Sequence, residues 1–67
     1  MLTWDDSYAI ARALQLQHQD IDLGLVSISM IHNWALELGG FNDEPELAND
    51  EILEAIYREW FEEVNSL

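Results

Sequence analysis

The chain has 67 residues, which is room for one small domain (residues 1–67) but too little to enclose a large catalytic cavity. Fourteen acidic residues stand against two arginines, and the formal net charge of −12 excludes nucleic acid and anionic membranes as direct partners while attracting cations and basic protein surfaces. With no cysteine, no leader pattern and no apolar stretch of about 20 residues, the sequence predicts a cytoplasmic monomer without disulfides, thiolate chemistry or membrane spans.

A first helix is predicted over about Asp6 to Gln17. Its apolar face recurs at helical spacing and consists of Ile10, Ala13 and Leu14. Asp5 or Asp6 is placed to accept hydrogen bonds from the first free backbone amides. Trp4 lies just outside the helix, where we expect it to be a core residue that folds back on the first turn.

Residues 18–24 are predicted to form a loop, because a glycine and two aspartates favour turns there. Ile21 and Leu23 are expected to point inward from this loop. His18 is suited to the negative end of the first helix. Residues 26–28 alternate between apolar and polar over too few positions for a sheet, so we expect at most one short extended segment.

A second helix is predicted with Ser29 as its cap. It should end at Gly39-Gly40, because glycine readily adopts the left-handed conformation that closes a helix. Its apolar positions are Ile31, Trp34, Ala35 and Leu38. Pro45 then predicts a single helical turn, for which Asp43 can act as the cap.

The last helix is predicted to begin after Asn49, which can cap it. Helical spacing would gather a broad apolar face of Ile52, Leu53, Ile56, Tyr57, Trp60, Phe61 and Val64. The other face carries the acidic residues Glu51, Glu54, Glu59, Glu62 and Glu63. Arg58 lies four residues from two of these glutamates and can pair with either. Either solubility or a cationic partner would account for so much negative charge.

Two loop clusters offer carboxylate oxygens that a hard cation such as iron, magnesium or calcium prefers. The candidate metal-binding residues are Asp20 and Asp22 in one cluster, and Asp43, Glu44 and Glu46 in the other. Neither cluster has the layout of an EF-hand. The simpler interpretation of both is a solvated acidic loop.

No catalytic constellation is recognisable, so we do not expect an enzyme. His32 is suited to acid–base chemistry, but no serine, cysteine or second histidine is placed to form a triad with it. We expect His32 to hold a backbone or carboxylate contact instead. Trp34 and Trp60 are expected to anchor the core, with indole N–H groups that find partners at its rim.

The order of landmarks along the chain matches a known protein family. The most specific are His32-Asn33-Trp34 and Ile52-Leu53-Glu54-Ala55-Ile56 followed by Trp60. The others are Leu2, Trp4, Asp6-Ser7, Ile10, Leu14, Asp20, Asp22, Val26, Leu38, Phe41, Asp43, Pro45 and Asn49. With these residues the chain resembles the IscX family, small acidic proteins of iron–sulfur cluster assembly. Met30 stands where that family usually has an aspartate, which removes one candidate carboxylate.

The three predicted helices make the fold class mainly α, and the resemblance implies a modified winged-helix (helix-turn-helix-like) domain that does not bind DNA. It also implies an adaptor or regulator that docks on a cysteine desulfurase through acidic surface and binds Fe(II) weakly and exchangeably through carboxylates. Other cluster-assembly proteins are further expected partners. We predict that the charged contacts with the partner come from Asp5, Asp6, Asp20, Asp22, Asp43, Glu44 and Glu46.

Functions of other classes stay open at this point. One is an acidic interaction module, or a nucleic-acid mimic, that offers carboxylates to the basic groove of a DNA-binding protein. Such a mimic should bind neither ferrous iron nor a cysteine desulfurase. Another is a small hydrolase, which would have to lose turnover when His32 alone is changed.

Overall fold

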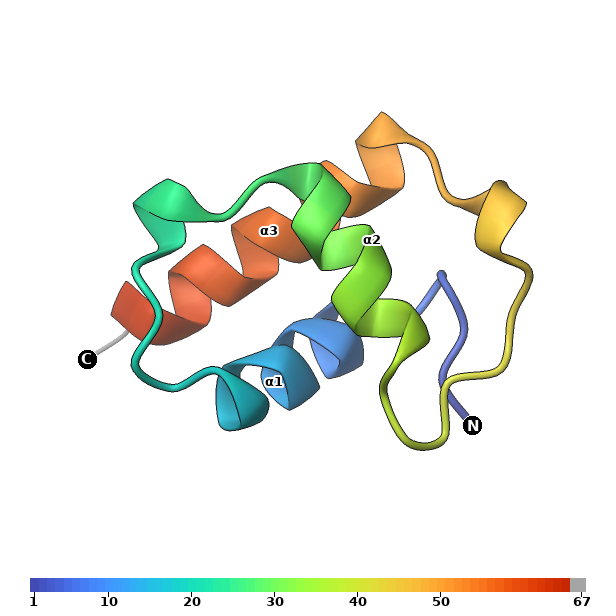
Figure 1. Ribbon diagram of the computed structural model, residues 1–67, viewed down its shortest axis with the longest axis horizontal. Coiled ribbons are helices and arrows are strands. Elements are labelled where there is room, and N and C mark those ends of the chain that lie inside the picture. Colours follow the sequence, from blue (N-terminus) through green and yellow to red (C-terminus); the bar gives the residue numbers. More distant parts are fainter. Residues whose placement is uncertain (66–67) are drawn as a thin grey trace.

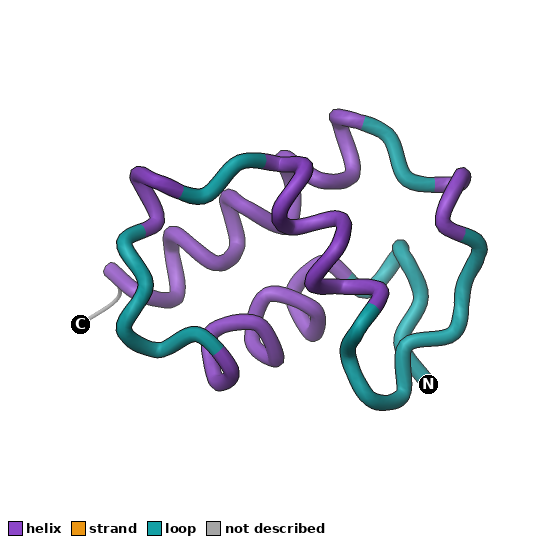
Figure 2. Tube along the Cα trace, viewed as in Figure 1, coloured by secondary structure: helices purple, strands orange, loops and turns teal. Residues whose placement is uncertain are grey.

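Three α-helices make up most of the molecule. The computed structural model describes residues 1–65, with α1 at Ser7–Gln17, α2 at Ile28–Leu36 and α3 at Asp50–Asn65. Two short 3₁₀ turns, η1 at Leu23–Leu25 and η2 at Pro45–Leu47, lie in the connections (Figures 1 and 2). The predicted mainly α, three-helix class is therefore confirmed, whereas the modified winged-helix assignment stays a prediction. No helix within residues 1–65 is long and apolar enough to cross a membrane.

The core forms where α3 packs against α1 and α2. Figure 1 shows α1 and α3 running along the long axis of the molecule, with α2 crossing them. The largest fully buried side chains are Ile10, Leu14, Ile31, Ile56 and Trp60. Each such side chain stabilises the fold by about 1.5–3 kcal/mol relative to an exposed one. The apolar periodicity of the sequence thus predicted the centre of the core.

The start of α1 differs from the prediction. Asp6 occupies the N-cap position but makes no side-chain cap hydrogen bond. Its Oδ2 instead accepts from the backbone N–H of Thr3 at 3.0 Å, and lies 3.4 Å from the hydroxyl of Thr3. The prediction that this aspartate caps the first helix is therefore wrong, because the carboxylate is already engaged by the preceding turn.

The boundaries of α2 also shift. Ser27, not Ser29, is the cap: its hydroxyl accepts from the N–H of Met30 at 3.1 Å, and the Met30 sulfur lies 3.4 Å from the N–H of Ser27. The helix ends at Leu36, before the two glycines, and only Gly40 has a positive φ, of 86°. The earlier start follows from the two reciprocal contacts, which satisfy two backbone donors at once.

For α3, the predicted Asn49 cap is confirmed, whereas the predicted width of its apolar face is wrong. Asn49 accepts a hydrogen bond from the N–H of Ile52 at 2.8 Å, as a cap should. Phe61 and Val64, however, are 50% and 49% exposed. The predicted apolar face was too broad, because its seven positions span about half of the helix circumference and α1 and α2 cover only part of it.

The segment before α1 is fastened to the segment after α2, and we call these residues, 1–6 and 40–45, the latch. Leu2 and Phe41 form an isolated parallel bridge, with Leu2 N–H donating to Gly40 O and Asn42 N–H to Leu2 O, both at 2.8 Å. This bridge is the only β-pairing among the residues that the structure describes. Figure 2 shows the two loop segments side by side at one end of the molecule.

Trp4 is the centre of the latch and is only 3% exposed. Its backbone N–H donates to Asp43 Oδ2 at 3.0 Å, and its indole N–H donates to Glu44 O at 2.7 Å. Its ring packs edge-on against Phe41 and stacks on His32, at centroid distances of 4.7 and 5.5 Å. Trp4 is thus a core residue, as predicted. The partners that hold it come from the distant segment around residues 41–45.

Candidate functional site

The two predicted carboxylate clusters lie far apart in space. Figure 1 shows the loop of residues 18–22 at one end of the long axis and the segment of residues 41–47 at the other. The molecule extends over 32 Å along this axis. Asp20 and Asp22 therefore cannot share a ligand with Asp43, Glu44 and Glu46. The latch does bring the segment of Asp43, Glu44 and Glu46 near Asp5 and Asp6. The reason is that Trp4, next to Asp5, is hydrogen-bonded to both Asp43 and Glu44.

The carboxylates of three predicted site residues already accept hydrogen bonds from backbone N–H groups. Asp43 accepts from two N–H groups, those of Trp4 at 3.0 Å and Glu44 at 2.8 Å. It does not cap η2, whose N-cap is Glu44 and lacks a side-chain hydrogen bond. Asp22 accepts from the N–H of Gly24 at 2.9 Å, and Asp6 from that of Thr3. A carboxylate used in this way has fewer lone pairs left for a metal or a partner.

The other predicted site residues are exposed, and no hydrogen bond to their side chains is present within residues 1–65. They are Asp5, Asp20, Glu44 and Glu46. No acidic side chain of the described residues is buried. These carboxylates are therefore open to water and fixed only by the backbone that carries them, which suits long-range attraction better than a rigid binding geometry.

No site for a tightly held metal ion is formed in the described part of the chain. Within residues 1–65, no three histidine, aspartate or glutamate side chains come together in a group that could hold one. The five predicted metal-binding residues thus stay a prediction. Their arrangement offers at most adjacent carboxylates within one cluster, and a cation held there would keep much of its water.

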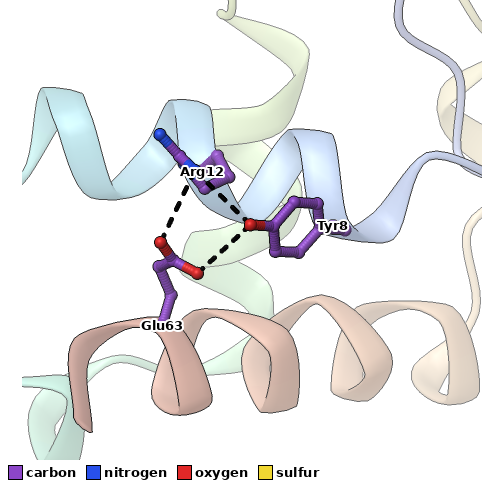
Figure 3. Close-up of polar contacts among 3 residues, drawn as sticks. All are labelled: Tyr8, Arg12 and Glu63. Atoms are coloured by element: carbon purple, nitrogen blue, oxygen red, sulfur yellow. Dashed lines mark hydrogen bonds and ion pairs between the residues drawn. The ribbon is translucent and has the colours of Figure 1, made fainter. Parts of the chain in front are cut away.

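An ion pair that the sequence analysis missed connects α1 to α3. Arg12 Nη1 lies 3.6 Å from Glu63 Oε1, and Tyr8 bridges them, with its hydroxyl 3.4 Å from both Arg12 Nη1 and Glu63 Oε2 (Figure 3). The hydrogen bond with Tyr8, and then the proximity of Glu63, raise the pKa of Arg12 above its ordinary value, so it stays charged. The spacing of Tyr8 and Arg12, four residues apart, was the available signal.

This contact changes the interpretation of the predicted acidic face of α3. Glu63 was predicted to lie on the outer face, but it points toward α1 (Figure 3). Among the residues that the structure describes, the contact of Arg12 with Glu63 is the only ion pair. The predicted pairing of Arg58 with its neighbouring glutamates is therefore not formed in this structure.

The two histidines have structural contacts. His32 Nε2 lies 3.0 Å from the carbonyl oxygen of Pro45, which confirms the predicted backbone contact. His18 occupies the C-cap position of α1, and its ring stacks on Trp34 at a centroid distance of 4.1 Å. Trp60, which is 1% exposed, lies beside Trp34 at 6.2 Å. Both histidines thus help to pack the aromatic parts of the molecule.

Comparison with known proteins gives a consistent assignment. The model of a protein family described as iron–sulphur cluster assembly matches residues 2–65. A protein of Pseudomonas aeruginosa, described only as uncharacterized, is 34% identical over 62 residues, which cover 92% of this chain and 94% of that protein. The matched range includes all three helices and the latch except Met1. The chain therefore belongs to the iron–sulphur cluster assembly family.

Proposed function

We propose that the protein is an IscX-like adaptor of iron–sulfur cluster assembly that docks on a cysteine desulfurase in the cytoplasm and tunes its sulfur transfer. The observation that carries the proposal is the set of hydrated carboxylates at the latch end, Asp5, Glu44 and Glu46, on segments that Trp4 ties together. No basic side chain lies in residues 1–6 or 40–47 to offset them. A modified winged-helix arrangement of the three helices is part of the same proposal.

The docking would be electrostatic. A net charge of −12 on so small a molecule speeds its encounter with a basic surface and repels competing anionic surfaces. Interactions between exposed charges weaken with salt, so the affinity should be modest and should fall steeply as ionic strength rises. Other acidic assembly proteins would compete for the same basic surface, and this competition would be the regulatory step.

Ferrous iron would be a cargo or a signal rather than a fixed cofactor. Adjacent carboxylates such as Glu44 and Glu46, or Asp20 and Asp22, can supply a few oxygen ligands while water supplies the rest. Because three-ligand groups are absent from residues 1–65, binding should be weak and exchangeable, and magnesium at millimolar concentration should compete.

The test of docking is equilibrium binding to a purified cysteine desulfurase across a range of ionic strength. The wild-type chain should bind, and the dissociation constant should rise with salt. Reversal of the four hydrated carboxylates (Asp5→Lys, Asp20→Lys, Glu44→Lys, Glu46→Lys) should abolish binding while the circular dichroism spectrum stays that of the wild type. Binding that survives this reversal would reject an electrostatic interface.

The test of iron binding is separate. Anaerobic titration with Fe(II), followed by calorimetry, should give weak heats that the same charge-reversed variant lacks. Reversal at one end of the molecule only should leave part of the binding. A tight site with a single fixed stoichiometry that depends on one cluster would contradict diffuse binding and would restore a defined metal centre.

A further inference from the structure

The exposed side of α3 carries a shallow open hollow of about 470 Å³, lined by Glu54, Tyr57, Arg58 and Phe61. These positions share one face of the helix, opposite the face that buries Ile56. The rings of Tyr57 and Phe61 lie 6.5 Å apart and are tilted by 34°. Phe61 is 50% exposed, so the hollow presents an aromatic surface to water.

The hollow is already formed in the free protein. The hydroxyl of Tyr57 donates to the carbonyl oxygen of Leu23 at 3.1 Å, and this bond fixes the ring against η1. The backbone that carries all four lining residues is the middle of a 16-residue helix. The free-energy cost of ordering this site when a ligand binds should therefore be small.

The charges at the rim select an uncharged group for the interior. Glu54 and Arg58, which are not ion-paired within residues 1–65, place opposite charges at the rim. A group of either charge would therefore be attracted by one and repelled by the other, with little net gain to offset its loss of hydration. The two rings favour an aliphatic or aromatic side chain, which gains by leaving water. The interior thus suits the apolar side chain of a protein partner.

The surroundings select the partner that brings this side chain. A second copy of the chain would bring another net charge of −12 against the first, which opposes self-association. Asp50 and Glu54 lie on the same face of α3 as Phe61, and Asp50 follows directly after the segment that leads from the latch end. A basic protein surface that follows this face of α3 can therefore extend from the latch end, with Glu44 and Glu46, to the hollow.

We propose that the hollow on α3 receives a single apolar side chain from the basic surface of the docking partner. This inference rests on the proposed docking function and adds a division of roles to it. The carboxylates set the association rate, because they act at a distance. The buried side chain sets the dissociation rate, because its contacts are lost only when the complex separates.

The test compares Phe61→Ser with Leu16→Ser in rapid-mixing kinetics with the cysteine desulfurase. Leu16 is an exposed leucine on α1, 64% accessible, and serves as the matched control. Phe61→Ser should raise the dissociation rate constant about tenfold and leave the association rate constant within about twofold, whereas Leu16→Ser should change neither. Wild-type kinetics for Phe61→Ser, in a complex that does form, would overturn the inference and leave the docking function standing.

A second arm does not depend on the desulfurase. The ¹⁵N-labelled chain is titrated with a short lysine-rich peptide that has one central tryptophan, and with the same peptide carrying serine in its place. The tryptophan peptide should shift the amide signals of residues 54–61, and the serine peptide should not; Phe61→Ser should remove the difference. Equal shifts with both peptides would overturn the inference, as would a dimer in sedimentation that Phe61→Ser dissociates.

If the desulfurase does not bind the wild type, the docking function fails and the peptide titration alone decides the inference. The two failures are therefore distinguishable. Circular dichroism of Phe61→Ser should match the wild type, because half of the ring is already in water. If this variant is unfolded, the peptide pair on the wild-type chain still gives a positive or a negative answer.

Discussion

The helical core and the latch are held together by different forces. The core joins α1, α2 and α3 through apolar side chains such as Ile10, Ile56 and Trp60 that are almost completely buried. The latch joins residues 1–6 to residues 40–45 through two backbone hydrogen bonds at Leu2 and two hydrogen bonds at Trp4, besides the packing of the buried Trp4 ring. The core contributes most of the stability, and the latch, which contributes less, determines where the negative charge of one end is displayed.

The largest expected effect comes from breaking the core. Trp60→Ala should cost about 3–5 kcal/mol, because it leaves a cavity where a fully buried indole was. A domain this small has a net stability of only about 3–5 kcal/mol, so the variant should be largely unfolded in circular dichroism at room temperature. Phe61→Ala, at the neighbouring position with a half-exposed ring, is the control and should stay folded. A folded Trp60→Ala would show that the core is less important than its burial indicates.

Breaking the latch should have the second largest effect. Asp43→Ala removes the acceptor of two backbone hydrogen bonds and should cost about 2–3 kcal/mol in urea unfolding. Asp20→Ala, which removes the same charge from a residue without such bonds, should cost less than about 0.5 kcal/mol. Equal stabilities for these two variants would mean that the Asp43 carboxylate serves only as surface charge.

These two regions also differ in how far the sequence predicts them. The core follows from the 3.6-residue period, which depends on neighbouring positions only. The latch depends on contacts of Trp4 with Asp43 and Glu44, which lie 39 and 40 positions further along the chain, and no local pattern specifies such contacts. For this reason Asp43 was predicted as a site residue and as a cap, and its part in holding Trp4 was missed. For the candidate site, the sequence suggests which residues take part but not how they are arranged, since its two clusters lie at opposite ends of the molecule; their roles stay a prediction.

Helix ends show a smaller version of the same contrast. The start of α2 was misplaced because two serines, Ser27 and Ser29, compete as caps, and the choice depends on the Met30 side chain that meets Ser27.

The cap of α3 should have a moderate effect on stability. Asn49→Ala should destabilise the protein by about 1 kcal/mol, because the side chain caps α3. Asn49→Asp, which keeps an acceptor, should restore most of the loss in thermal melts. A loss as large for the aspartate variant would show that the cap hydrogen bond is not what Asn49 supplies.

The smallest effect is expected at the ion pair between α1 and α3. Arg12 is exposed, and water and salt screen its attraction to Glu63, so Arg12→Gln should leave the unfolding midpoint nearly unchanged. Loss of this cation should instead speed association with a basic partner slightly, since it makes the net charge more negative. A clear drop in the melting temperature would show that the contact of Tyr8, Arg12 and Glu63 contributes to the fold.

The most direct test of the latch end as the docking surface compares two double variants that each raise the net charge from −12 to −8. One is Asp5→Lys with Glu46→Lys at the latch end, and the other is Asp20→Lys with Glu59→Lys, of which Asp20 lies at the opposite end and Glu59 on the side of α3 away from the hollow. The measurement is the association rate constant with the cysteine desulfurase at low ionic strength. We predict that the first pair lowers it about tenfold and the second about twofold. Equal decreases, or a larger one for the second pair, would contradict the account, because the partner would then sense only total charge or the wrong end.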